Sequence, residues 1–466
     1  MTSELFNKPF QARFASIHLP AFIVMLSFLA LTVFSRSNYS HDLFLFFTLM
    51  AVCYILIFGF FIYLWHYQIQ ISGRYVFSWA LMFHMMGVLG SPLFEDDYFR
   101  YLWDAYQSVH LGGPFGIAPS EYFYQDELSQ SIPHQFQAIL DRINYPDIAT
   151  IYAPGFQYSF LLAYVIAPGE VWALQLIYSA IDMGLIGILL KLAKPNMVML
   201  YAWSPLVFKE VILTAHPDGL AVCLLVAAIL CLKRQYFYRT AILLGASVAS
   251  KIFAILFVPF ILIQCRPRHW LAFIFTIYLL YFPFLNNGES DLLGLGAMAN
   301  SWEFNSAFYG VLTLWFSPAT SKLILAFLLC VFMGGYFLHY FKLRLGFNLS
   351  SIRSIFMIKK NPSIIRGDWL MGIFLLCSPV INPWYLIWVL PFASLYFNPS
   401  AWLASVMVML AYVVGLNIET IEFLGPYDQP IWLRVLEFAI IFAALFLQGI
   451  YCWRKNMQTK SIAKIM

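Results

Sequence analysis

The sequence predicts an all-α integral membrane protein, with about 11–13 transmembrane helices and some re-entrant segments in one polytopic domain over residues 1–466. Hydrophobic residues make up 62% of the chain and charged residues only 11%, and the mean hydropathy is +0.76. About a dozen apolar runs of roughly 16 to 25 residues follow one another, the length a helix needs to cross a bilayer. Basic and acidic residues also gather in different loops. A soluble chain of this size could not bury so much apolar surface.

Three apolar runs open the chain, near 15–35, 43–65 and 75–94. The first run is longer than the core of a signal peptide and lacks a small-residue cleavage site, so we expect it to remain as a helix. Lysine and arginine in short loops mark the cytoplasmic face of a membrane protein. Lys8 and Arg13 therefore place the N-terminus inside, and three crossings bring the next loop to the extracytoplasmic side.

That next loop, residues 95–153, is the first large extracytoplasmic loop, and we expect it to carry helices that lie in the membrane interface. It contains only two basic residues, Arg100 and Arg142. Its acids are Glu95, Asp96, Asp97, Asp104, Glu121, Asp126, Glu127, Asp141 and Asp147. The scarcity of basic residues fits the extracytoplasmic side.

Basic clusters farther along keep this sidedness only if two apolar segments, 155–168 and 240–264, do not each make one simple crossing. The first segment is short and ends in Pro168-Gly169, and the second is interrupted by Ser250-Lys251. We expect both to be re-entrant or broken hairpins, which a membrane tolerates where the backbone lines a cavity. The basic loop 342–367 is then cytoplasmic.

Several function classes are excluded or disfavoured by simple counts. The formal net charge of +4 is too small to suggest binding to nucleic acid. The seven cysteines lie mostly inside apolar runs without CxxC spacing, which argues against a disulfide framework or a zinc site. The chain has no HExxH, Walker-type or GxGxxG signature, so a protein driven by nucleotide hydrolysis is not expected.

The stretch EDDYFRYLWDAYQ concentrates acids in an otherwise apolar chain. Asp97, Arg100, Tyr101 and Asp104 are spaced i, i+3, i+4, i+7, so a helix over 96–110 would align them on one face. Such carboxylates can act as a general base, orient a cationic partner or bind a divalent metal such as Mg²⁺ or Mn²⁺. The alternative is a solvated acidic loop in which Arg100 pairs with Asp97 or Asp104.

Polar residues inside apolar runs are the next candidates, because charge in a membrane is costly and often functional. Lys251 could hold a phosphate or extend to the interface. Lys209 could bind substrate or form an ion pair with Glu210. His216 and Asp218 could serve a site or simply cap a helix.

Aromatic and amide residues near expected outer helix ends complete the set. Trp302 and Asn305 lie in SWEFNSAFYG, and Trp384 and Tyr385 lie in INPWYLIW. Each aromatic could anchor the interface or contact a sugar ring.

Seven stretches, in order, resemble GT-C glycosyltransferases that use polyprenyl-phosphate sugars, including bacterial multi-pass mannosyltransferase-like proteins. They are EDDYFRYLWDA, LGGPFGIAPSEYF, INYPDIATIYAPGFQYSF, SPLVFKEVILTAHPDGLAV, GASVASKIFAILFVPFIL, WEFNSAFYGVL and NPWYLIWVLPF. The sequence departs from the usual family wording at Ala105, where Gly is usual, at Gly113-Pro114-Phe115, and at Ala153. These departures concern the sugar or acceptor rather than the scaffold.

The resemblance implies a GT-C-like bundle in the cytoplasmic (inner) membrane, with its active site facing the extracytoplasmic side. It implies inverting transfer of a hexose, with mannose as one candidate, from a polyprenyl-phosphate donor to a glycan, lipid or protein acceptor. Asp97, or next Asp96, would be the general base. The expected substrate-binding residues are Glu95, Arg100, Tyr101, Asp104, Tyr152, Gln157, Lys209, His216, Asp218, Lys251, Trp302, Asn305, Trp384 and Tyr385. The alternatives are a transporter or flippase of a lipid-linked glycan, or a non-catalytic subunit of envelope assembly.

Overall fold

The computed structural model describes residues 10–123, 132–287, 290–345, 365–417 and 429–465. Within these ranges every element is helical, and the one β-contact is an isolated bridge between Phe304 and Val380. The predicted all-α class is confirmed. Most of the predicted cytoplasmic loop 342–367 lies outside the described residues.

The first three apolar runs form α1 (Phe10–Ser35), α2 (Leu43–His66) and α3 (Gly73–Gly87). The Asp42 side chain accepts a hydrogen bond from the Leu45 N–H at 3.0 Å. The Ser72 hydroxyl accepts one from the Tyr75 N–H at 3.1 Å. Each cap satisfies an amide that has no partner within the helix, so α2 and α3 begin where the sequence places these polar residues.

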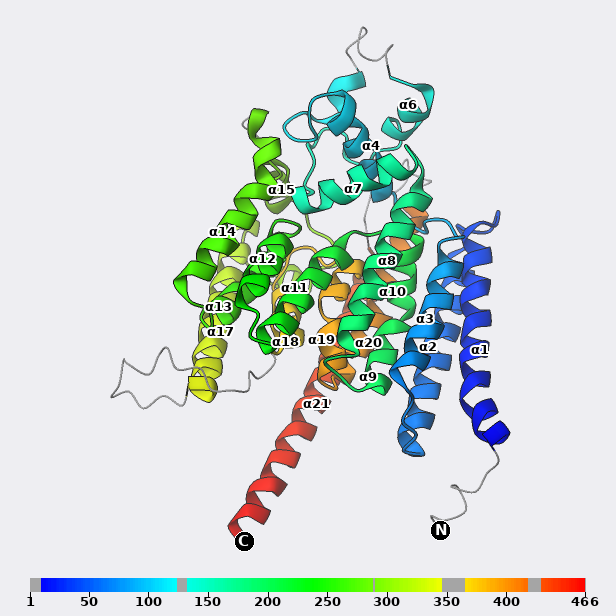
Figure 1. Cartoon of the computed structure of the whole chain (residues 1–466), viewed down its shortest axis with the longest axis vertical. Helices are drawn as coiled ribbons and strands as arrows, with labels where there is room; N and C mark the ends of the chain where they lie inside the picture. Colours follow the sequence, from blue (N-terminus) through cyan, green and yellow to red (C-terminus); the bar gives the residue numbers. More distant parts are fainter. Residues whose placement is uncertain (1–9, 124–131, 288–289, 346–364, 418–428, 466) are drawn as a thin grey trace.

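Loop 95–153 forms the upper end of the molecule in Figure 1 as α4 (Asp97–His110), η2 (Pro119–Phe123) and α6 (His134–Leu140). The helix predicted for 96–110 is therefore present. Arg100 and Asp104 are buried, and so are Leu102 and Trp103. α4 packs into protein on both of its faces, and its predicted place in the membrane interface stays a prediction.

A bent pair of helices follows the loop. α7 (Pro154–Ile166) and α8 (Val171–Leu189) lead to α9 (Pro195–Ala202), α10 (Pro205–Val207), the π-helix η3 (Phe208–Leu213) and α11 (Asp218–Lys233). The stretch Pro195–Leu213 and α11 are bent by 120° at the break between them. This break brings the start of α11 next to η3 and beneath loop 95–153.

The apolar segment 240–264 is broken, as the sequence predicts. α12 (Phe237–Val248) ends, and η4 (Ile252–Phe257) and α13 (Val258–Leu262) continue after residues 249–251. The Gly155 N–H donates to the Ala249 carbonyl at 2.8 Å, and a Cβ on Gly155 would lie 2.1 Å from Ser250 Oγ. Glycine is required at this close approach, which fixes the break against the end of loop 95–153. Re-entry of the segment stays a prediction.

The C-terminal half of the chain forms a further set of helices. Its elements are α14 (Pro267–Tyr281), η5 (Phe282–Asn287), α15 (Leu292–Ser301), α16 (Phe308–Leu312), α17 (Pro318–Leu345), α18 (Gly367–Leu376), η7 (Pro383–Trp388), α19 (Leu390–Leu395), α20 (Pro399–Met407), η8 (Val408–Asn417) and α21 (Ile431–Ile465). α1 begins and α21 ends at the bottom of Figure 1, opposite α4 and α6.

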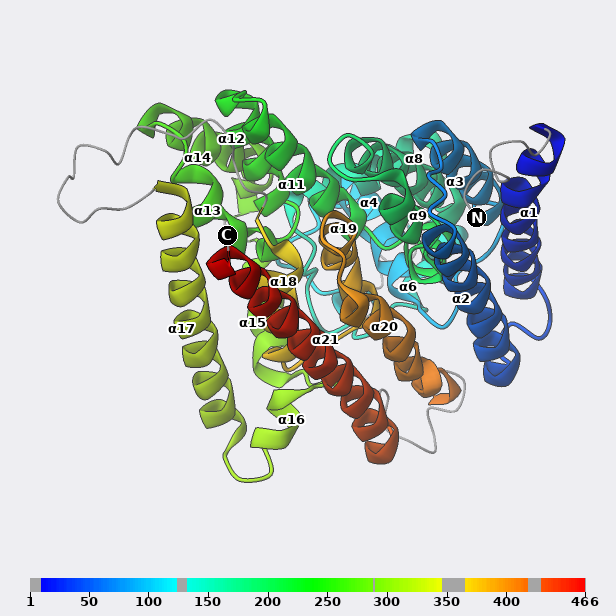
Figure 2. The same ribbon diagram turned by 90° about the horizontal axis from the view of Figure 1, so that it is seen from below.

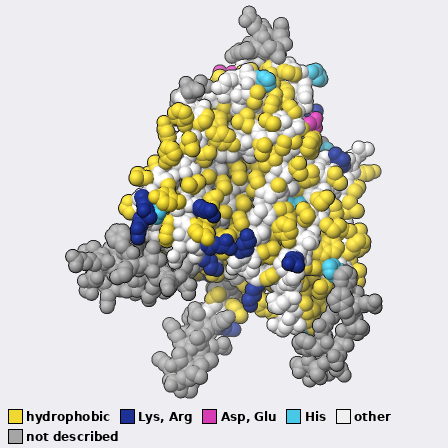
Figure 3. All heavy atoms as spheres, in the orientation of Figure 1, with side chains coloured by type: hydrophobic (Ala, Val, Ile, Leu, Met, Phe, Trp, Pro, Cys, Tyr) yellow, Lys and Arg dark blue, Asp and Glu magenta, His cyan; other side chains and the backbone are white. Residues whose placement is uncertain are grey.

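Within the described ranges, six helices are long and apolar enough to cross a membrane, or up to seven if the bent pair counts as one span. Several shorter apolar helices, such as Phe237–Val248 and Gly367–Leu376, fall below that length. The predicted total of 11–13 counts such short segments as crossings and stays a prediction. Apolar side chains cover most of the face in Figure 3, and its Lys and Arg side chains lie mainly in the lower part, away from loop 95–153.

Candidate active site

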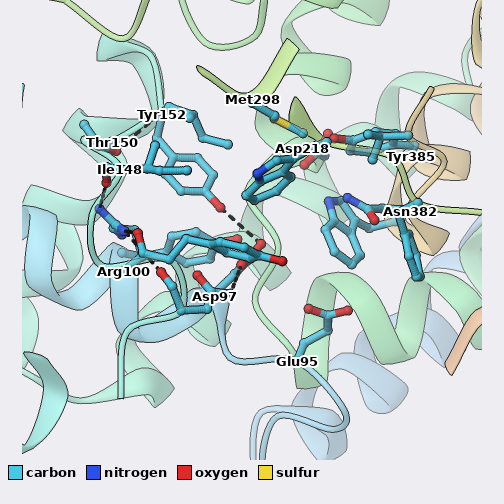
Figure 4. Close-up of a pocket in the computed structure, with 18 of the residues that line it drawn as sticks. Glu95, Asp97, Arg100, Ile148, Thr150, Tyr152, Asp218, Met298, Asn382 and Tyr385 are labelled. Atoms are coloured by element: carbon cyan, nitrogen blue, oxygen red, sulfur yellow. Dashed lines mark hydrogen bonds between the residues drawn. The ribbon is translucent and has the colours of Figure 1, made fainter. Parts of the chain in front are cut away.

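A cavity of about 530 Å³ lies where loop 95–153 meets the rest of the molecule (Figure 4). We call it the polar cavity. Its walls come from loop 95–153, the start of α11, the break after α12, the connection from α15 to α16, and residues 380–385. Of the predicted site residues it is lined by Glu95, Asp97, Arg100, Tyr101, Tyr152, Asp218, Lys251, Trp302, Trp384 and Tyr385.

Asp97, the first residue of α4, is held by two donors from the same loop. The Asn144 side-chain amide donates to Asp97 Oδ1 at 3.0 Å and to Asp96 Oδ1 at 2.6 Å. The Tyr152 hydroxyl donates to Asp97 Oδ2 at 3.1 Å. Burial raises the pKa of Asp97, whereas these two donors, followed by the charges of Arg100 and Lys251, lower it.

Asp96 lies beside Asp97 but does not line the polar cavity. Burial, followed by the charge of Asp97, raises the pKa of Asp96 to about 7. Asn144 donates to both carboxylates, so it offsets part of their mutual repulsion.

Glu95 differs from its two neighbours. It makes no hydrogen bond or ion pair with any described residue, and its carboxylate points into the polar cavity (Figure 4). Burial raises the pKa of Glu95 well above its usual range, and the charge of Lys209 opposes this. One carboxylate oxygen from each of Glu95, Asp96 and Asp97 lies within 4.8 Å of the others. Such a set of oxygens is of the kind that Mg²⁺ or Mn²⁺ binds.

Arg100 has neither of the partners that the sequence suggested. Its guanidinium donates to the backbone carbonyls of Ile148 at 2.9 Å, Tyr145 at 3.0 Å and Asn144 at 3.3 Å. Burial lowers the pKa of Arg100, and the charge of Asp104 opposes this. Arg100 therefore fastens the backbone from which Asn144 reaches Asp96 and Asp97.

Asp104 and Gln157 are buried behind the wall of the polar cavity. Asp104 Oδ2 accepts hydrogen bonds from the Thr150 hydroxyl and from the Gln157 amide, the latter at 2.9 Å. Burial raises the pKa of Asp104 to about 6. These contacts join α4 to the start of α7 and so hold Tyr152 in place.

Lys251 enters the polar cavity from the opposite side, at the break after α12. Its Nζ lies 2.6 Å from Asp218 Oδ1, which also accepts from the Trp388 indole at 2.8 Å. Nζ lies 4.7 Å from the centre of the Tyr385 ring. The Lys251 side chain is 18% exposed and is held by these partners rather than extended to a distant surface.

A second cavity of about 390 Å³ adjoins the first, and its lining is mostly hydrophobic. We call it the apolar cavity. α15, α17 and α18 supply much of its lining, including Leu295, Leu325, Leu329 and Phe374. Lys251, Tyr152 and Tyr385 line both cavities, so an ammonium group lies where a polar space meets an apolar one.

Lys209 and His216 lie one layer behind the polar cavity. Lys209 Nζ is 3.2 Å from Glu210 Oε2, and the Tyr412 hydroxyl donates to Glu210 Oε1. His216 stacks on Trp384 with ring centres 4.1 Å apart, and its Nδ1 is 3.2 Å from the Tyr101 hydroxyl. The ion pair with Glu210 that the sequence offered as an alternative for Lys209 is present.

Trp302 and Asn305 lie on opposite sides of one wall. Trp302 lines the polar cavity, where its ring centre is 4.4 Å from that of Tyr145. Asn305 faces away, and its amide donates to Glu437 Oε1 at 3.0 Å. The backbone bridge between Phe304 and Val380 holds this wall together.

Sequence reasoning missed several residues of the polar cavity, notably Asn144, Tyr145, Glu303 and Asn382. All four lie inside stretches quoted for the family resemblance. Asn144, Tyr145 and Asn382 are neutral, and Glu303 is paired with Arg434, so none of them stands out as an unpaired charge in an apolar run. Tyr145 has a backbone φ of +44°, which is uncommon for a residue with a side chain and often occurs at functional sites.

A comparison with protein families matches residues 171–266 to a model described as alpha-(1->6)-mannopyranosyltransferase, N-terminal domain. The matched region runs from α8 to the residue before α14 and includes Lys209, His216, Asp218 and Lys251. It confirms the predicted resemblance to mannosyltransferases of the GT-C type. Neither the curated proteins nor the solved structures gave a match.

Proposed function

We propose that this chain is an inverting glycosyltransferase that moves a hexose from a polyprenyl-phosphate donor to an acceptor, with mannose as the first candidate for the hexose. The chain resembles α-(1→6)-mannopyranosyltransferases over residues 171–266. The reaction would take place on the extracytoplasmic side of the cytoplasmic membrane. One observation carries the proposal: Lys251 lies at the junction of the polar and apolar cavities, and the carboxylate of Asp97 lies in the same polar cavity.

The donor is an amphiphile, and the two joined cavities match its two parts. The isoprenoid chain occupies the apolar cavity, where burial of hydrocarbon is favourable. The phosphate lies against Lys251, and the hexose extends into the polar cavity among Trp302, Trp384 and Tyr385. Hydrogen bonds and aromatic stacking of this kind orient a sugar ring in a pocket.

Asp97 is the general base of the transfer. Its carboxylate takes the proton of the acceptor hydroxyl as that oxygen forms a bond to the anomeric carbon. The bond from this carbon to the phosphate oxygen breaks, and its electron pair stays on the phosphate, whose charge Lys251 stabilises. A single displacement inverts the anomeric configuration, and the proton on Asp97 then passes to solvent. Asn144 and Tyr152 hold the carboxylate in one orientation for this step.

A divalent cation fits the acidic end of the cavity. Glu95 offers a carboxylate without a protein partner in the described residues, and Asp96 and Asp97 offer oxygens close to it. Bound there, Mg²⁺ or Mn²⁺ would neutralise negative charge next to the donor phosphate. The chain's own residues would hold it through oxygen ligands only.

The test is transfer by the purified protein in lipid vesicles, with radiolabelled hexoses on polyprenyl phosphates as donors and membrane extracts as acceptors. We expect a labelled product from mannosyl donor, with an anomeric configuration opposite to that of the donor. Movement of the intact donor across the vesicle without a new glycosidic bond would instead establish a transporter. Donor binding without either activity would establish a non-catalytic subunit.

A further inference from the structure

A third cavity, of about 500 Å³, lies between α18, α20 and α21, away from Lys251. We call it the slot. One face of α21 lines it from Glu437 to Cys452, through Phe438, Ile441, Leu445 and Gln448. These ends are 15 residues apart in the helix, which corresponds to a length of about 22 Å. Figure 2 shows α21 running alongside α20.

Two glycines leave the slot open. Gly372 in α18 and Gly449 in α21 both line it, and a Cβ added to either would meet no other atom within 4 Å. Glycine weakens a helix compared with alanine, and close packing does not require it at these positions. The space beside Gly372 and Gly449 is therefore open, and a side chain larger than glycine at either position would extend into it.

Polar groups occur only towards the two ends of the slot. Glu437 lies at one end, where it accepts from Asn305. At the other end Asp368 is bound by Arg366, 2.6 Å from Oδ2, and by the Asn398 amide at 2.8 Å. Glu437 Oε1 and Asp368 Oδ2 are partnered by protein, whereas Glu437 Oε2 is buried without a hydrogen-bond partner among the described residues, and the stretch between the two ends is mostly hydrocarbon. A long, mostly apolar space of this kind can accommodate a hydrocarbon chain.

The Glu437 end of the slot lies directly behind the polar cavity. Ile381 lines the slot, whereas its neighbours Val380 and Asn382 line the polar cavity, so one backbone segment separates the two spaces. Close to this segment, Arg434 of α21 lies 3.4 Å from Glu303, another residue of the polar cavity. The Glu437 end of the slot and the polar cavity that contains Asp97 are therefore separated by residues 380–382 and by the Arg434–Glu303 ion pair.

We propose that the slot binds the hydrocarbon chain of the acceptor, so that the acceptor is lipid-anchored and its chain lies apart from that of the donor. This inference rests on the proposed function, because the donor chain already occupies the apolar cavity. The acceptor's sugar or hydroxyl head passes the Arg434–Glu303 ion pair and enters the polar cavity.

The first test is independent of activity. Dodecyl α-mannoside with a photoreactive diazirine at the chain end is cross-linked to the full chain in phosphatidylcholine vesicles. We expect adducts on α18, α20 or α21 that excess dodecyl α-mannoside removes and methyl α-mannoside does not. Gly449→Leu and Gly372→Leu fill the slot and should abolish these adducts. Gly59→Leu is the matched control, because Gly59 lies in α2, has no atom within 4 Å of an added Cβ, and lines none of the three cavities.

The second test asks whether the bound chain belongs to the acceptor. With a mannosyl polyprenyl-phosphate donor, we expect Gly449→Leu to raise KM for dodecyl α-mannoside about tenfold, the effect of losing roughly two buried methylenes. KM for methyl α-mannoside should stay as in the unmodified protein. Absence of adducts in α18, α20 and α21 would overturn the slot as a chain site. Adducts accompanied by an unchanged KM for dodecyl α-mannoside would assign the slot to a bilayer lipid and overturn the acceptor. Cross-linking without any transfer would contradict the proposed function but not the slot.

Discussion

Two groups of charged residues lie in or next to loop 95–153, and they differ in their access to a cavity. In the polar cavity, Glu95, Asp97 and Lys251 present charge to an open space. Behind it, Lys209 and Glu210 in the π-helix η3 are completely buried and paired with each other, and the Tyr412 hydroxyl and His216 Nε2 also contact Glu210. We call this second group the sealed cluster. Both groups contain acids and a lysine, but of the two only the first lines the polar cavity.

The difference shows what a charge in an apolar run can mean. A buried ion pair is held because either member alone would be an unpaired charge in a medium of low polarity. A charge at a cavity has partners that leave room for one more, as Lys251 has in Asp218 and the Tyr385 ring. Changes in the sealed cluster should therefore alter stability, and changes in the polar cavity should alter turnover.

Asp97→Asn tests the polar cavity most directly. We expect kcat to fall about 10²- to 10⁴-fold, because the amide keeps the shape of the side chain but cannot take a proton. Donor binding and thermal stability should change little. Asp141→Asn, an exposed acid in the same loop, is the matched control and should keep full activity. Equal loss in both variants would show that general charge in the loop matters, not this base.

Lys209→Met tests the sealed cluster. Breaking a buried pair leaves Glu210 without its countercharge, so the free energy of unfolding should fall by about 3–5 kcal/mol, measured by titration with SDS in mixed micelles. The fraction that stays folded should transfer sugar at nearly the original rate. The double variant Lys209→Met, Glu210→Gln should recover much of the stability. A stable but inactive Lys209→Met protein would show that this lysine takes part in the reaction, and the sealed cluster would then not differ from the polar cavity in its role.

Lys251→Met removes the cation at the junction of the two cavities. We expect transfer to fall about 10²- to 10³-fold, because the departing phosphate loses its charge partner. Lys251→Arg keeps the charge and should retain a larger part of the activity. If Lys251→Met lowers only the unfolding free energy, Lys251 belongs with the sealed cluster instead.

Asn144→Ala should give the smallest effect, a shift in pH dependence. The Asn144 amide lowers the pKa values of Asp96 and Asp97, so its loss raises both. A general base acts as the carboxylate, and the acid limb of kcat/KM against pH should therefore move to higher pH. Gln137→Ala, which removes an exposed hydrogen bond to Asp141 in the same loop, should leave the profile in place.

The same carboxyl groups predict how stability depends on pH. The pKa of Asp96 is about 7 in the folded protein and 3.8 is its ordinary value, so the folded state holds this proton more tightly. The resulting stabilisation is present at low pH and is lost as the pH rises through about 7. Asp96→Asn should flatten that part of the stability profile, and an unchanged profile would show that Asp96 does not titrate there.

The sequence was informative wherever charge or a break interrupted an apolar pattern. It predicted the helical class, the helix at 96–110 and the break at Ser250-Lys251, and it left an ion pair with Glu210 as one of two alternatives for Lys209; the structure contains each of these features. Lys251, Lys209 and Glu210 are residue types that are costly in a membrane, so their presence in apolar runs requires a local explanation.

What the sequence could not predict depends on contacts between distant segments. Arg100 has the fork that suits a phosphate, but its actual partners are three backbone carbonyls 44 to 48 residues away. Asn305 lies three residues after Trp302, yet it faces α21 instead of the polar cavity. The direction of a side chain in an irregular segment follows from the backbone path, and no periodic pattern encodes that path.

Gly155 connects the two sides of the proposed site, the segment with Tyr152 and the segment with Lys251. Its backbone is bonded to Ala249, and its missing side chain admits Ser250, so the segment that carries Tyr152 cannot slide without moving Lys251. In the proposed reaction, the segment that holds Asp97 through Tyr152 and the segment that carries Lys251 would therefore keep a fixed spacing. A relative with a different spacing between acceptor and donor would have to change Gly155 together with Ala249 and Ser250, because a change on one side alone would break their contact.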